Sequence, residues 1–169
     1  DTKSGIVYLT EDRGAAGLYR FIPKRKTKLA EGGTLQMLKV AAPSSFSWQA
    51  DLRTGLKAGQ SFAATWVNIN EPDAPAAEQR ADAIYQQGFT QGAATFARLE
   101  GIWYAGDSLF FTSTSGGDKK LGQVWQYTPQ GKDNWDFVKL QLPIVGKILR
   151  QVYVSPLANN LSTLIQGGI

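Results

Sequence analysis

Short runs of β-branched and aromatic residues alternate along this chain with turns rich in glycine and proline. The first run, Ile6 to Thr10, ends at a turn around Gly14, and the second run closes at Pro23. Runs of this length, bounded by turn residues, are typical of β-strands rather than of amphipathic helices. The pattern predicts an all-β protein with strands over 5–11, 18–22, 34–40, 62–69, 94–101, 109–113, 122–128 and 137–142.

The pattern changes between the fourth and fifth predicted strands. Residues 75–85 are rich in alanine and other good helix formers, and Pro75 suits the first turn of a helix. Gly88 is expected to end this helix. We predict one short inserted helix over 75–87, and an inert surface helix is the simpler interpretation of it.

The second half of the chain repeats the first in outline. In each half, an apolar strand, a glycine-rich turn and an aromatic strand are followed by a proline and a third strand, so that Tyr19 corresponds to Trp125 and Pro23 to Pro129. Repeated sheet units indicate a β-propeller fragment of two to three blade-like sheets, forming a single partial domain over 1–169. Because propellers need about four to eight blades, we expect the chain to be incomplete. A β-sandwich of the same strands is the structural alternative.

The composition limits the available chemistry. The chain has no cysteine and no histidine, which excludes disulfides, thiolate nucleophiles and the commonest transition-metal ligands within it. A metal held by this chain alone would rely on oxygen ligands, which favours hard ions such as Ca²⁺ or Mg²⁺. The net charge of +4 is densest over 24–28, where no aromatic residues are interleaved, so we predict a solvated loop and no nucleic-acid partner. No apolar run of the roughly 18 residues that would predict a membrane span occurs.

Two places combine charged residues in a pattern that suits chemistry. In the strand over 94–101, Arg98 and Glu100 project from the same face, while Leu99 points to the other side. This pair is either a simple ion pair or an oxyanion clamp beside a metal ligand. Glu11 and Asp12 follow the first strand, where adjacent carboxylates either bind a cation or only cap the turn.

Several longer motifs occur in a fixed order along the chain. They are Val7-Tyr8-Leu9-Thr10-Glu11-Asp12-Arg13, Gly17-Leu18-Tyr19-Arg20-Phe21-Ile22-Pro23, Gly32-Gly33-Thr34-Leu35, Phe96-Ala97-Arg98-Leu99-Glu100-Gly101 and Gly122-Gln123-Val124-Trp125-Gln126-Tyr127. Together they resemble the PhoX-like phosphatase family, formerly catalogued as a bacterial domain of unknown function. The resemblance covers about Asp1 to Pro129 and fades beyond it.

The resemblance implies a propeller fold and an active site of calcium and iron ions that hydrolyses phosphomonoesters. It makes Glu11 and Glu100 candidate metal ligands and Arg98 a candidate catalytic phosphate clamp. The iron ion, Fe³⁺, has a cysteine ligand in the family, and this chain contains no cysteine. We therefore expect Ca²⁺ as the cofactor and expect this segment alone to be inactive, with the remainder of the propeller or another chain completing the site.

Three functions remain open from the sequence. The first is a metal-dependent phosphomonoesterase of the PhoX type, acting as a hydrolase when full length. The second is a non-catalytic propeller module that binds a partner and uses Ca²⁺ only for structure, and the third is a calcium-dependent lactonase-like propeller. Arg98 favours the phosphatase, because a lactonase has less need of a guanidinium clamp. The resemblance also predicts a periplasmic or secreted protein.

Overall fold

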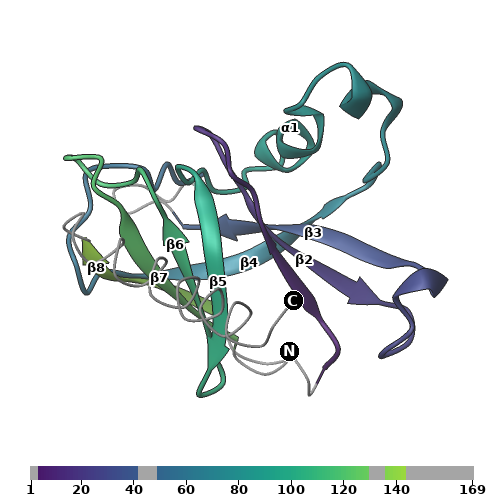
Figure 1. Cartoon of the computed structure of the whole chain (residues 1–169), viewed down its shortest axis with the longest axis horizontal. Coiled ribbons are helices and arrows are strands. Elements are labelled where there is room, and N and C mark those ends of the chain that lie inside the picture. The colour runs from purple at the N-terminus through teal and green to yellow at the C-terminus, as the bar shows by residue number, and fades with distance from the viewer. Residues whose placement is uncertain (1–3, 42–48, 130–135, 144–169) are drawn as a thin grey trace, which may run out of the picture.

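The part of the chain that the structure describes folds into a single antiparallel sheet with one short α-helix packed on its outer face (Figure 1). A computed structural model describes residues 4–41, 49–129 and 136–143. The sheet order is β1-β2-β3-β4-β8-β7-β6-β5. The all-β prediction is therefore confirmed. The strands are β1 (Val7–Thr10), β2 (Leu18–Pro23), β3 (Gly33–Val40), β4 (Ser61–Ile69), β5 (Leu99–Ala105), β6 (Ser108–Ser113), β7 (Gln123–Thr128) and β8 (Asp136–Pro143).

Each half of the sheet is a meander of four strands, and the repeat read from the sequence lies within them. The hairpins β1–β2 and β6–β7 are each followed by a third antiparallel strand, β3 and β8, but their places in the sheet differ, because β1 is an outermost strand and β6 lies next to the outermost strand β5. The blade-like sheets expected as separate units are nevertheless joined into one, because β4 pairs with β8 from Ser61↔Lys139 to Ala64↔Asp136. This pairing satisfies two strand edges that separate sheets would leave open.

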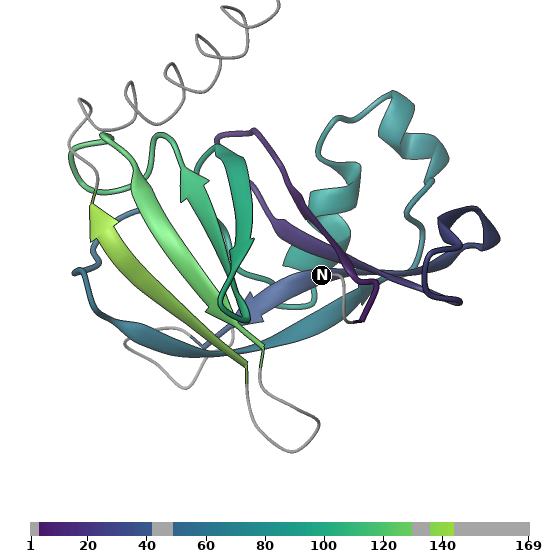
Figure 2. The same ribbon diagram turned by 60° about the horizontal axis from the view of Figure 1, so that its bottom comes forward.

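The two ends of the sheet meet at one end of the molecule. The turn after β1 and the segment before β5 form backbone hydrogen bonds in both directions, with N···O distances of 2.9 Å for Ala16 to Phe96 and 2.9 Å for the reverse bond. Leu99 N also donates to Glu11 O at 3.0 Å. The strands consequently curl toward a closed barrel, as the turned view in Figure 2 shows. We call this junction of Glu11–Ala16 with Phe96–Leu99 the seam.

Large aromatic and aliphatic side chains fill the space that the curled sheet encloses. Trp125 and Tyr127 alternate with half-exposed residues along β7, as a strand with one buried face requires. Phe96 packs edge-on against Trp125, with ring centroids 5.4 Å apart. Because Phe96 and Leu99 are both fully buried in this core, the segment that carries Arg98 is anchored on either side of it.

The predicted helix over 75–87 divides into two elements. Pro75–Glu78 forms a 3-10 turn, η2, and Ala83–Phe89 forms the α-helix α1, while a further 3-10 turn, η1, spans Leu29–Glu31. Gly88 does not end the helix, because it lies within α1 where that helix crosses β3. A Cβ at Gly88 would stand 2.2 Å from Met37 Sδ. The helix can pack this close to Met37 because Gly88 has no side chain. The helix covers a second small cluster that contains Tyr19, Met37, Ile69 and Tyr85.

Candidate active site

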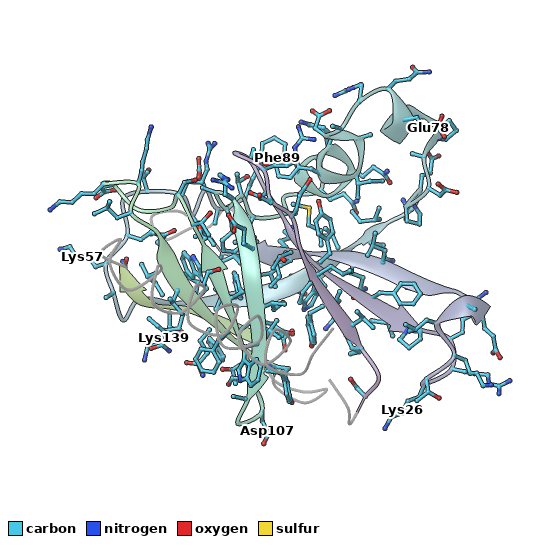
Figure 3. All side chains as sticks on the ribbon, viewed as in Figure 1. Lys26, Lys57, Glu78, Phe89, Asp107 and Lys139 are labelled. Carbon is cyan, nitrogen blue, oxygen red and sulfur yellow. The ribbon has the colours of Figure 1, made fainter. Side chains whose placement is uncertain are left out.

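The candidate residues lie at the end of the sheet where the seam closes it. The β1–β2 turn and the start of β5 meet there, and the connection after β6 reaches the same place. Figure 3 shows Phe89 of α1 near this end, whereas Asp107, in the β5–β6 turn, marks the opposite end. The fold therefore brings Glu11, Asp12, Arg98 and Glu100 to one region, although the two pairs lie far apart in the sequence.

The backbone of Arg98 has a conformation that is rare for residues with a side chain. Its φ is 49°, in the left-handed region. Glycine adopts this region readily and asparagine and aspartate do so occasionally, but it is unfavourable for other residues. Two hydrogen bonds hold it there, from Arg98 N to Arg13 O at 2.7 Å and from Thr114 N to Arg98 O at 2.8 Å. Thr27, Asp107 and Lys120 also have positive φ, so this conformation supports Arg98 as a site residue only together with the contacts of its side chain.

The Arg98 side chain is held by two carboxylates. Its Nε and Nη2 donate to Asp12 Oδ1 and Oδ2, at 2.8 and 3.1 Å, and Nη2 also donates to Glu100 Oε1 at 3.0 Å. Arg98 and Glu100 thus lie on one side and Leu99 is buried at 1% exposure, as expected. The predicted strand over 94–101 is wrong at its start, however, because β5 begins at Leu99 and the left-handed backbone of Arg98 lies outside it. The hydrogen bond from Arg98 lowers the pKa of Asp12 and raises that of Arg98, so both stay charged at neutral pH.

Glu11 points away from this group. Its Oε2 accepts hydrogen bonds from Gly17 N and from the Tyr19 hydroxyl, both at 2.9 Å. Burial, followed by the charge of Glu11, raises the pKa of Tyr19 far above its usual value, so the phenol stays a proton donor. The Glu11 carboxylate therefore caps the β1–β2 turn on the β2 side, which is the simpler of the two roles considered for it.

The two candidate metal ligands have different hydrogen-bond partners. The Glu100 Oε1 atom accepts a hydrogen bond from Thr114 Oγ1, just after β6, at 2.6 Å, whereas Glu11 Oε2 accepts one from Gly17 N, just before β2. Across residues 4–41, 49–129 and 136–143 there is no group of three or more acidic side chains placed to hold a metal. Ca²⁺ takes about six to eight oxygen ligands, so the described residues by themselves do not fit a calcium centre.

The comparison with protein families decides the identity of the chain. A family model described as alkaline phosphatase PhoX matches residues 1–147. The chain belongs to the PhoX alkaline phosphatase family. No curated protein and no solved structure matched the chain. The family match continues beyond Pro129, where the similarity seen in the motifs fades, and a phosphatase-type function follows from it.

Two residues of the candidate site were not singled out from the sequence. Asp12 was considered only as a neighbour of Glu11, but it is the carboxylate that pairs with Arg98. Its position at a strand end, next to a candidate metal ligand, was the feature of the sequence that could have indicated this role. Thr114 supports both the Arg98 carbonyl and the Glu100 carboxylate. Its role depends on the β5–β6 pairing, which leaves no local mark in the sequence.

Proposed function

We propose that this PhoX-family protein hydrolyses phosphomonoesters and that Arg98 binds the phosphoryl group as the catalytic clamp. The observation that carries the proposal is a guanidinium held by two carboxylates on a strained, doubly hydrogen-bonded backbone. Its side chain is 49% exposed, so a substrate reaches it without a rearrangement of the core. A clamp that is rigid before the substrate arrives loses little entropy on binding it.

The hydrogen-bonding capacity of Arg98 supports this role. A guanidinium carries five N–H groups, and the three hydrogen bonds to Asp12 and Glu100 leave both N–H groups of Nη1 without a bond to any described residue. These donors have no acceptor among the described residues, and a guanidinium edge suits the equatorial oxygens of a phosphoryl group. Charge that develops on those oxygens during hydrolysis is stabilised by the fixed cation.

Calcium dependence is a separate part of the proposal and rests on the family resemblance. When bound, such an ion would polarise the phosphoryl group. Glu11 and Glu100 each keep one carboxylate oxygen without a hydrogen bond to a described residue, which leaves an oxygen for a cation in the intact protein. We also propose export to the periplasm or beyond. Within the described residues, no helix is long and apolar enough to cross a membrane.

The test is the hydrolysis of a generic phosphomonoester by the intact protein with added Ca²⁺ and with a chelator. We expect turnover that the chelator abolishes, and a loss of about 10²- to 10³-fold in kcat for Arg98→Ala, as when one preorganised charge-stabilising donor is removed. Arg53→Ala is the matched control, because Arg53 is also half-exposed and paired with an aspartate, Asp51. It should leave turnover unchanged.

Two results would replace this proposal with one of the other functions. Tight Ca²⁺ binding without turnover of any phosphomonoester would favour the non-catalytic binding module. Hydrolysis of lactones but not of phosphomonoesters would favour the lactonase-like propeller. Unchanged turnover in Arg98→Ala would remove the clamp role even in an active phosphatase.

A further inference from the structure

We propose that the inner face of the curled sheet, toward the end opposite the seam, binds a small organic acid with Arg20 of β2 as the cationic anchor. The site uses none of the residues of the candidate active site, and the proposal does not depend on the phosphatase function. Three observations carry it: a row of polar side chains across the sheet, an aromatic platform under Arg20, and a cavity beside them.

Three neighbouring strands carry polar side chains at adjacent positions of the inner face. Arg20 follows the buried Leu18 by two residues and Gln36 precedes the buried Leu38 by two, so both point to the side of the sheet that holds the core. Arg20 and Gln36 are direct cross-strand partners, and Gln36 is in turn the partner of Asn68. The inner face, which is apolar in the core, therefore becomes polar at this level, and such departures from the hydrophobic pattern are expected at functional sites.

Hydrogen bonds along this polar row hold the guanidinium of Arg20 by its Nε atom. Arg20 Nε donates to Gln36 Oε1 at 2.7 Å, and Gln36 Nε2 donates to Asn68 Oδ1 at 2.8 Å. The second bond uses the amide nitrogen of Gln36, so it keeps the oxygen of that side chain turned toward Arg20. The other four N–H groups of the guanidinium, on Nη1 and Nη2, have no hydrogen bond to any described residue.

Trp66 supports one face of the same guanidinium. Arg20 Cζ lies 4.4 Å from the centroid of the Trp66 ring, within the range of a cation–π contact. The indole is itself held in place, because Trp66 Nε1 donates to the Tyr127 hydroxyl and to Asp136 Oδ2, each at 3.1 Å. A guanidinium that is held by one atom and one face loses little entropy when it binds an anion, and its planar N–H groups match the two oxygens of a carboxylate.

A cavity of about 290 Å³ lies between the two outermost strands of the sheet, β1 and β5. Its lining includes Tyr8, Ile102 and Trp103, and none of the described residues that line it is charged. It also reaches Leu109, which follows the β5–β6 turn, and Figure 3 shows Asp107 of that turn at the end opposite the seam. A cavity of this size is at the lower end of the range for small-molecule sites.

Tyr8 connects this cavity with the polar row. It lines the cavity and is also the cross-strand partner of Arg20, so the two side chains are neighbours on the inner face. Its ring lies 6.2 Å from the ring of Trp66, the platform beneath the guanidinium. The positive charge of Arg20 thus stands next to an uncharged, largely apolar cavity. The ligand that complements both parts is an organic acid with a carboxylate for the guanidinium and an aromatic or other apolar body for the cavity.

Titration of the full chain with benzoate tests the site, and the ¹⁵N–¹H signal of the Trp66 indole, assigned by its absence in Trp66→Phe, reports where the probe binds. We expect saturable shifts of this signal with benzoate and at least about tenfold weaker binding of benzamide, its neutral analogue, since hydrogen bonds to a charged group contribute that much. Arg20→Met, which removes the charge but keeps an apolar stem over Trp66, should weaken benzoate binding to the same extent. Arg25→Met is the matched control and should leave binding unchanged, because Arg25 is 67% exposed and paired with Glu31, outside the polar row.

Gln36→Glu provides a second variant, which leaves Arg20 in place. The new carboxylate should pair with the guanidinium and weaken benzoate binding by at least about tenfold, whereas Gln36→Leu should weaken it less, because it removes a hydrogen bond without adding a charge.

Four results would overturn the proposal. They are a Trp66 signal that benzoate does not shift, equal binding of benzamide and benzoate, unchanged benzoate binding in Arg20→Met or Gln36→Glu, and loss of the shift in Arg98→Ala, which would assign the anion to the candidate active site. Benzoate contains no phosphoryl group, so these results do not depend on phosphatase turnover.

Discussion

At position 98, the glycine variant should be more stable than the alanine variant, whereas at an ordinary site alanine is the more stable of the two. Both substitutions remove the guanidinium and its bonds to Asp12 and Glu100 equally, so the difference between them isolates the backbone. Alanine keeps the cost of the left-handed conformation at φ 49°, which is about 1–2 kcal/mol for an L-residue. Glycine avoids that cost but loses about 0.5–1 kcal/mol more conformational entropy on folding.

The balance favours glycine by about 0.5–1 kcal/mol. Two hydrogen bonds, from Arg98 N to Arg13 O and from Thr114 N to Arg98 O, hold the backbone and prevent it from relaxing to a lower-energy φ. For a chain of 169 residues, this difference corresponds to roughly 1–4 °C in Tm. In urea it should move the unfolding midpoint by about 0.3–0.6 M for a typical slope of denaturation.

Arg53 provides the control for this comparison. Its side chain is 42% exposed and paired with Asp51, much as Arg98 is paired with Asp12, but its backbone lies outside the left-handed region. At this position alanine should be more stable than glycine by about 0.5–1 kcal/mol. Urea unfolding followed by tryptophan fluorescence measures all four variants. If Arg98→Ala proved as stable as Arg98→Gly, or more so, the strained backbone and the argument built on it would be refuted.

Three further outcomes are expected. Leu99→Ala should destabilise the fold by about 2–5 kcal/mol in urea unfolding, because Leu99 is 1% exposed and its loss leaves a cavity under the seam; a change below 1 kcal/mol would contradict this burial. Gly88→Ala should lower stability by about 1–3 kcal/mol, since the new Cβ meets Met37, whereas alanine in an unobstructed helix would stabilise it. The pKa values of Asp12 and Asp51 are lowered by hydrogen bonds from arginine, so their contribution to stability is present above pH 3.8 and is lost as the pH falls below it. Urea midpoints between pH 6 and 2 should show this loss, and Asp12→Asn should reduce it.

The sequence by itself determined the local structure and part of the site. Alternating and β-branched runs predicted most strands close to those found, because burial of one face of a strand imposes a period of two. The exception is the strand predicted over 94–101, which spans Leu99–Ala105. The sequence also predicted that Arg98 and Glu100 lie together and that Leu99 is in the core, although Arg98 precedes β5 and reaches Glu100 from a left-handed backbone rather than from a strand. The longer motifs pointed to the PhoX family, to which the chain belongs.

Local pattern could not assign partners to strand edges. The β1–β2 and β6–β7 hairpins are alike in sequence, but whether their meanders stand apart as blades or join through β4 and β8 depends on which edges hydrogen-bond. Backbone N–H and C=O groups carry no residue identity, so the sequence records this choice only weakly. The helix end shows the same limit: Gly88 resembled a stop signal and instead allows α1 to approach Met37.

Only the tertiary structure decided how the charged residues of the site combine. Asp12 and Arg98 are 86 residues apart in the chain, and the seam brings them together through backbone hydrogen bonds between the β1–β2 turn and the segment before β5. That junction turns Glu11 toward Gly17 and Tyr19, and it leaves Asp12 to pair with the arginine. The direction of each carboxylate depends on the donors that folding places within about 3 Å, and spacing along the chain does not contain that information.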